Sequence, residues 1–233
     1  MHLVAAVLAE WQIARARVLR TRLGLWLLLI GVGLVALAAH PAGPNARAVV
    51  TLAAMLGAVL AIAFTLGSDL DRAALELTLA HPTSAAAVLW GRWLAATALA
   101  GALAAAAGCG AAWIGPRPER PAALALAALV AAGATAGCAA ALAVLGGNVL
   151  TGALFLYIGV AGAVPPSAWE RMALVGAGRR AVATLAAVLP AGWRYERLEA
   201  GDPGAWRHAL AWIAGGVSLA VLGLQARRWA RRR

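Results

Sequence analysis

Few side chains in this sequence could do chemistry, and their spacing suits neither catalysis nor metal binding. Cys109 and Cys138 lie in apolar stretches among small residues, and we interpret them as packing residues. The four histidines lack the spacing of metal ligands: His2, His40, His81 and His208. There is no serine and histidine pair, no HExxH motif and no ordered array of aspartates. We therefore predict a protein that is not an enzyme and holds no metal or cofactor.

The basic residues are also unusual, because all 20 are arginines and the chain has no lysine. A phosphate-binding loop needs a lysine to reach the nucleotide phosphates. ATP hydrolysis by this chain is therefore not expected. The abundance of alanine and glycine together with the missing lysine indicates a GC-rich gene, and we predict a bacterial source.

The composition is that of a membrane protein. Hydrophobic residues make up 63% of the 233 residues and charged residues 12%, with a mean hydropathy of +0.81. The net charge of +11 raises the possibility of a nucleic-acid partner. However, the arginines are split between the chain ends and loops, with long apolar runs between them, so no continuous basic face forms. We predict a lipid bilayer as the partner and no nucleic acid.

Six apolar runs approach the roughly 20 residues that cross about 30 Å of hydrocarbon. Prolines, glycines and aspartates mark their boundaries, including the Gly146-Gly147-Asn148 break. The sequence predicts an all-α, polytopic protein with one transmembrane domain over residues 1–233. Its predicted spans are residues 23–39, 48–67, 93–114, 122–145, 149–164 and 209–226.

Two segments outside the spans have helical character. Residues 1–22 place Val4, Val7, Leu8, Trp11, Ala14 and Val18 on one face, which favours an amphipathic helix on the membrane surface. The alternative is a simple extension of the first span. Residues 165–208 are predicted to form an extracytoplasmic loop, in which residues 181–189 are too short to cross and form a re-entrant or interfacial helix before Pro190.

An even number of spans places both chain ends on one side of the membrane. Both ends are rich in arginine, and the positive-inside rule makes that side cytoplasmic. The prediction is a multi-pass protein of the bacterial inner membrane with both termini in the cytoplasm.

Residues 68–84, between the second and third spans, are predicted to form a cytoplasmic helix. Ser68 or Asp69 can cap it, Pro82 stops it, and Thr83 or Ser84 can cap the next helix. A helix held by short connections between two spans can act as a lever on both. The alternative is an ordinary loop helix lying on the membrane surface.

This stretch resembles the permeases of ABC-2 type transporters. The family has, in order, an acidic and basic cluster, a small pair, Leu-Glu with a leucine run, a proline before a hydroxyl residue, and a Gly-Lys pair. The matching residues here are Asp71-Arg72, Ala73-Ala74, Leu75-Glu76 with Leu77 and Leu79, Pro82-Thr83, and Gly91-Arg92. Ala73 replaces the usual glycine and Arg92 the usual lysine.

The resemblance implies a subunit that pairs with a second permease subunit, alike or different, and docks on cytoplasmic nucleotide-binding subunits that hydrolyse ATP. It implies that coupling to this ATPase partner is carried by Asp69, Asp71, Arg72, Leu75, Glu76, Leu77 and His81. The nearest alternative is the haem-exporter permease of cytochrome c maturation. A membrane anchor or assembly factor that transports nothing is the alternative from another class.

The cargo path would lie where two permease subunits meet. Gly133-x-x-x-Gly137 is a candidate subunit packing motif, since small residues let helices approach closely. The spans hold almost no charge, whereas an ion pathway needs intramembrane ionisable groups. We therefore expect export of an apolar or amphiphilic substrate.

Overall fold

The computed structural model describes residues 2–20, 29, 31, 33, 46–71, 84–114, 120–165, 168, 176–198 and 200–231. Every regular element within these residues is helical, and they contain no strand. The all-α prediction is therefore confirmed for the described part of the chain. Most of the predicted first span, residues 23–39, lies outside the described residues.

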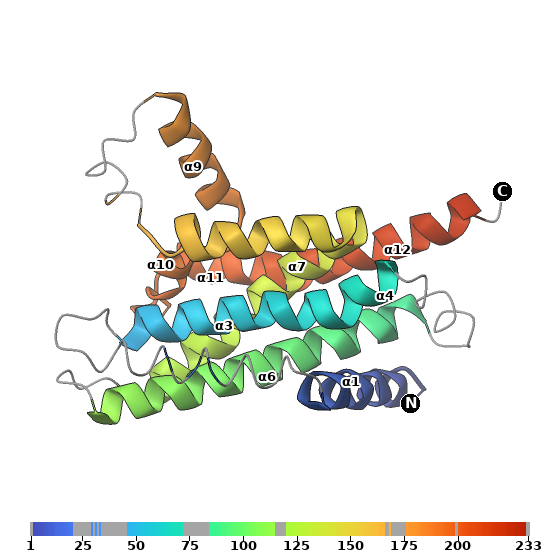
Figure 1. Cartoon of the computed structure of the whole chain (residues 1–233), viewed down its shortest axis with the longest axis horizontal. Coiled ribbons are helices and arrows are strands. Elements are labelled where there is room, and N and C mark those ends of the chain that lie inside the picture. Colours follow the sequence, from blue (N-terminus) through green and yellow to red (C-terminus); the bar gives the residue numbers. More distant parts are fainter. Residues whose placement is uncertain are drawn as a thin grey trace.

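The helices pack side by side into a long bundle (Figure 1). Three of the segments, named η, have a wider π-helical turn and continue the α-helices beside them. In chain order the elements are α1 (His2–Arg20), α3 (Ala46–Ile62), η1 (Ala63–Gly67), α4 (Ser68–Asp71), α6 (Ala85–Ile114), α7 (Pro121–Tyr157), η2 (Ile158–Gly162), α9 (Ala177–Val188), α10 (Gly192–Tyr195), α11 (Pro203–Leu210), η3 (Ala211–Gly216) and α12 (Val217–Arg231).

Four helical stretches of the described chain are long and apolar enough to cross a membrane. They are Ala46–Leu70, Ala85–Gly110, Pro121–Gly162 and Pro203–Arg227. An α-helix pairs its backbone N–H and C=O groups by hydrogen bonds within the helix, as the hydrocarbon of a bilayer requires. The chain is thus a helical, membrane-embedded protein.

The longest stretch is broken in the middle. Gly146 and Gly147 have non-helical backbone angles, and Gly147 has φ 63° and ψ −150°. The predicted break at these glycines is therefore confirmed, and it divides the stretch into a first arm (residues 121–145) and a second arm (residues 148–162). Unbroken, 42 residues would extend about 60 Å, twice the thickness of the hydrocarbon.

The two arms run in opposite directions across the bundle. Leu124 of the first arm and Val50 of α3 both lie next to Gly108, so the first arm starts at the Val50 end of α3. The second arm starts at the other end of α3, where Asn148 lies against Gly67. The second arm ends beside the Val50 end of α3, where the first arm starts. Gly162 lies near Gly192, and Gly192 lies near Thr51.

Replacing Gly147 by alanine tests this reversal. The positive φ at this position is disfavoured for a residue with a Cβ atom, so we expect a loss of about 1–3 kcal/mol in the free energy of unfolding. Gly152→Ala in the second arm is the matched control, since no atom lies within 4 Å of its added Cβ. Unfolding in mixed detergent micelles measures both variants, and equal stability of the two would contradict the reversal.

Small residues make up the centre of the bundle. Ala131 to Ala141 of the first arm are all buried, between α3, α6 and η3. Both chain ends and α4 lie at one end of the bundle, and α10 lies at the other (Figure 1). The bundle therefore has two distinct ends, each with its own polar contacts.

One capping prediction is wrong. Ser68 does not begin a new helix, because its backbone is helical (φ −62°, ψ −31°) and the helix continues unbroken from α3 through η1 into α4. Its hydroxyl donates back to the Phe64 carbonyl at 2.7 Å instead of capping an N–H group. Ser84 does cap α6, accepting from the Ala87 N–H at 3.1 Å. Residues 72–83 lie outside the described residues.

The surface helices differ from prediction in detail. In α1, Ala14 and Val18 are buried against the bundle, whereas Val4 and Leu8 of the same predicted face are exposed. The short helix expected at residues 181–189 is present but starts earlier, at Ala177, and ends at Val188 before Pro190. The membrane positions proposed for these two helices remain predictions.

Candidate functional site: a buried ionic junction of three helices

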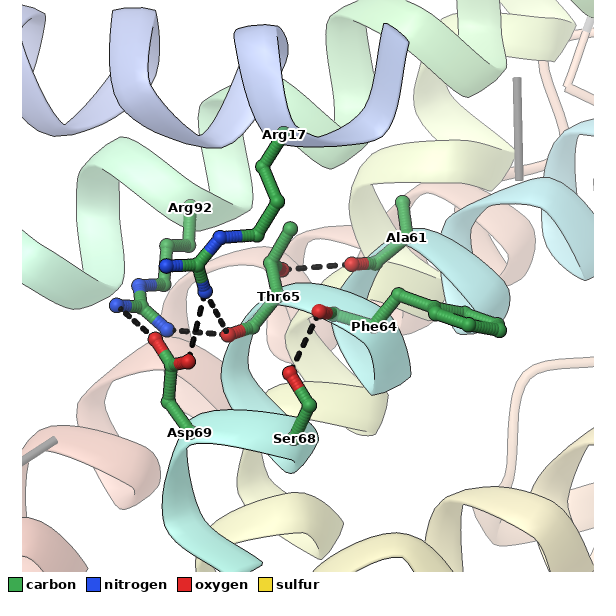
Figure 2. A network of polar contacts seen from close by, with 7 residues as sticks. All are labelled: Arg17, Ala61, Phe64, Thr65, Ser68, Asp69 and Arg92. Atoms are coloured by element: carbon green, nitrogen blue, oxygen red, sulfur yellow. Dashed lines mark hydrogen bonds and ion pairs between the residues drawn. The ribbon is translucent and has the colours of Figure 1, made fainter. Parts of the chain in front are cut away.

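The described ion pairs meet at one carboxylate. Asp69, in α4, accepts from Arg92 of α6 and from Arg17 of α1, with each N···O distance at 2.7 Å. Figure 2 shows the two guanidinium groups converging on Asp69 from separate helices. A single carboxylate thus joins three elements that are far apart in sequence.

The wide turn of η1 supplies a second acceptor. The carbonyl oxygen of Thr65 accepts from Arg92 and, at 3.5 Å, from Arg17 (Figure 2). A π-helical turn disturbs the regular i to i−4 bonding of a helix, and such turns are frequent at functional sites. The Thr65 hydroxyl bonds within its own helix, to the Ala61 carbonyl at 2.6 Å. The backbone of η1 thus takes part in holding both arginines.

Burial divides the junction into an inner and an outer pair. The side chains of Asp69 and Arg92 are 8% and 5% exposed, whereas that of Arg17 is 41% exposed. A buried ion pair depends on the presence of both partners, because removing one leaves an uncompensated charge away from water. An exposed pair contributes little. Asp69–Arg92 is therefore the structural link, and Arg17 is the peripheral member.

Close backbone packing brings α1 to the junction. A Cβ atom at Gly91 would meet the Val7 carbonyl oxygen, the Trp11 N–H and the side chain of Glu10. Gly91 therefore lets α1 lie directly on the start of α6. The Arg15 guanidinium covers the Trp11 ring at 4.8 Å, which is a cation–π geometry. The close approach of α1 at Gly91 places Arg17 within reach of Asp69.

Two of the predicted coupling residues are within the described chain. Asp69 lies in the junction, and Asp71 is the last residue of α4. The remaining five lie outside the described residues: Arg72, Leu75, Glu76, Leu77 and His81. In the sequence, Arg92 stands out only as part of a motif, and Arg17 is one of several arginines near the N-terminal end. The sequence does not reveal that α1 packs against Gly91 or that the next residue, Arg92, is buried.

The two glycines of the predicted packing motif are buried within this chain. Gly137 lies against the Trp212 carbonyl and Gly216 of η3, and Gly133 lies near Trp93 and Ile213. The Trp93 indole N–H also donates to the Gly133 carbonyl at 2.8 Å. In this structure both glycines pack helices of one chain, and the subunit contact stays a prediction.

A second polar network lies toward the other end of the bundle. The Tyr195 hydroxyl is 3.1 Å from Nδ1 of His208, whose Nε2 is 3.0 Å from the Val188 carbonyl. Trp212 donates to the same carbonyl at 2.7 Å, and Arg194 donates to the Ala186 carbonyl at 2.9 Å. These donors satisfy carbonyls at the C-terminal end of α9 that have no partner within the helix.

Burial changes the acidity of two groups beside this network. Burial raises the pKa of Tyr195 well above its ordinary value, so its hydroxyl stays protonated and can donate. Burial also raises the pKa of Glu196, against the opposing charges of Arg47 and Arg197. The network is therefore built from neutral and cationic donors.

An open groove of about 430 Å³ lies between α3 and the second arm. Its walls are mostly apolar, and its polar groups gather at the end near α4. Phe64, on the wall nearest the junction, is 51% exposed. The lining residues are Val59, Leu60, Ala63, Phe64, Ser68, Asn148, Thr151, Gly152 and Phe155.

Within the described residues no group of three or more histidine, cysteine, aspartate or glutamate side chains could hold a metal ion. The arrangement around Asp69 holds charges in place. A scan against models of protein families finds no match, and a search among curated proteins finds no significant match either.

Proposed function

We propose that this chain is the membrane-spanning permease subunit of an ABC-2 type transporter in the bacterial inner membrane. The observation that carries the proposal is the buried Asp69–Arg92 ion pair at 2.7 Å. Asp69 precedes residues 72–83 in the chain and Arg92 follows them, so the pair fastens the two helices that this segment connects. These are the residues in which the sequence resembles the coupling region of the family.

The physical argument is that of a lever. If the helices on either side of residues 72–83 could slide past each other, a push on this segment would move only the residues near it. A buried charge pair resists such sliding, because separation would leave both charges without compensation. A push from an ATPase subunit on residues 72–83 would then move α3 and α6 together.

The arrangement of the bundle supports six crossings. The described chain supplies α3 with η1 and α4, then α6, the two antiparallel arms of residues 121–162, and α11 with α12. We propose that the apolar residues 23–39 supply the sixth. Both chain ends lie at the α4 end (Figure 1), and their arginines favour the cytoplasm for that end.

The groove between α3 and the second arm supports an amphiphilic cargo. An apolar chain would lie along Val59, Leu60 and Phe155, and a polar group would meet Ser68 and Asn148. Among the described residues no charged side chain lines the groove, which suits such a molecule better than an ion. We propose export, driven by separate nucleotide-binding subunits and shared with a second permease subunit.

The test replaces Leu75, Glu76 and Leu77 together by alanine in the assembled transporter. We expect ATP hydrolysis to continue and export of a fluorescent amphiphile from proteoliposomes to fall at least tenfold, since the push no longer reaches the spans. The matched control is Leu126→Ala, which alters an exposed apolar residue of α7 that is not part of residues 72–83. Export by the triple variant at the control rate would refute the proposal.

A further inference from the structure

The helix α9 stands out sideways from the bundle, and no helix of the described chain packs along most of its length. Figure 1 shows it running steeply across the direction of α3 and α12, attached by its C-terminal end. With 12 residues it is about 18 Å long, too short to cross a bilayer. Ala186 is its one buried residue.

The base of α9 is fixed to the bundle. Its last carbonyls accept from Arg194, His208 and Trp212, so the helix is anchored by side chains of the elements that follow it. Trp193 lies beside the anchor, with the Arg194 and Arg197 guanidinium groups over its ring at 5.3 and 5.6 Å. Tryptophan with arginine is typical of the boundary between hydrocarbon and water.

The free part of α9 has two different sides. Leu185 and Val188 share one side with Ala177 and Ala181, at helical spacing, and they are 45% and 57% exposed. Arg179 and Arg180 lie outside that side, near the N-terminal end of the helix. The helix contains no acidic residue.

We infer that α9 binds the bilayer surface, with Leu185 and Val188 among the acyl chains and Arg180 on anionic phospholipid headgroups. A short amphipathic helix held at the level of a tryptophan boundary has lipid on its free sides. Anionic headgroups complement its charge. A second copy of the same helix would oppose arginine with arginine, because a two-fold contact pairs a surface with itself. This inference rests on the membrane-embedded fold and is independent of the proposed transport function.

The test uses a fluorescent label at one cysteine in lipid nanodiscs, where both membrane faces are open to solvent. Cys109 and Cys138 are first replaced by alanine, and the label is placed by Leu185→Cys or, as matched control, by Ala183→Cys on the opposite side of α9. We expect brominated acyl chains to quench the label at 185 and iodide to spare it. The label at 183 should show the reverse.

The headgroup contact is tested by adding Arg180→Gln and comparing discs of phosphatidylcholine alone with discs containing phosphatidylglycerol. In the anionic discs we expect this change to lower the ratio of lipid-quenched to iodide-quenched label about fivefold. In neutral discs the ratio should stay unchanged.

Three results would overturn the inference. Equal quenching of both positions by iodide would place α9 in water. A label at 185 shielded from both quenchers would show that protein covers this side. If Arg180→Gln changed the ratio of lipid-quenched to iodide-quenched label by the same factor in both kinds of disc, the anionic headgroups would not take part in the contact. Thermal unfolding and elution as a single species confirm that each variant is folded, so none of these results can be assigned to misfolding.

Discussion

Replacing Asp69 by asparagine is expected to lower the free energy of unfolding by about 3–5 kcal/mol. The substitution keeps the size of the side chain but leaves the Arg92 guanidinium, only 5% exposed, without its counter-charge. Unfolding in mixed detergent micelles, followed by circular dichroism, measures the loss. This is the largest single effect that we predict in the described chain.

Two further variants separate the buried pair from the outer one. Arg17→Gln is expected to cost about 1 kcal/mol or less, because Arg17 is 41% exposed and its charge is screened by solvent. The double variant Asp69→Leu with Arg92→Leu should be more stable than Asp69→Asn, since it leaves no buried charge. If Asp69→Asn proves no more harmful than Arg17→Gln, the junction does not hold the helices together.

The second large effect is expected at Gly137. An alanine there would place its Cβ against the Trp212 carbonyl, a backbone atom that cannot move aside without shifting η3. Overpacking of this kind is expected to cost about 1–3 kcal/mol in the free energy of unfolding. Measured in detergent, the loss would show how tightly the first arm packs on η3.

Gly133→Ala is the matched control, one helical turn earlier. Its added Cβ would be 3.4 Å from the nearest side chain, which is ordinary contact, so the gain in helix propensity offsets any crowding. We expect a change within about 1 kcal/mol. A larger loss at Gly133 than at Gly137 would contradict the packing described here.

The coarse fold was predictable because each apolar run, taken alone, favours a membrane helix. Gly146 and Gly147 were recognised as a break, and the backbone there needs a conformation that a side chain resists. The capping role of Ser68 was wrong because a local signal competes with an already formed helix, which continued through it. Local sequence shows what can end a helix, not whether it does.

The ionic junction was only partly predictable. Asp69 is predicted as a helix cap and as a coupling residue, but its partners come from helices before and after it in the chain. Arg92 stands out in the sequence through its place in a motif, whereas Arg17 is one of several arginines near the N-terminal end. Pairing of this kind depends on how α1 lies on α6. That contact is possible because Gly91 has no side chain.

The junction makes use of the several hydrogen-bond donors of an arginine. Arg92 bonds both the Asp69 carboxylate and the Thr65 carbonyl, and its several donors can reach two acceptors at once. A lysine offers a single charged nitrogen from which to do the same. We expect the fork of Arg92 to make the link between α4 and α6 more rigid.

The proposed division of labour between this chain and an ATPase subunit is tested most directly by photolabelling. The tagged chain is purified from its native membranes, and the complex is exposed to a photoreactive ATP analogue. We predict that the label appears on a co-purifying subunit and never on this chain, and that the complex hydrolyses ATP. Labelling of this chain, or a purified complex without an ATP-binding subunit, would contradict the account.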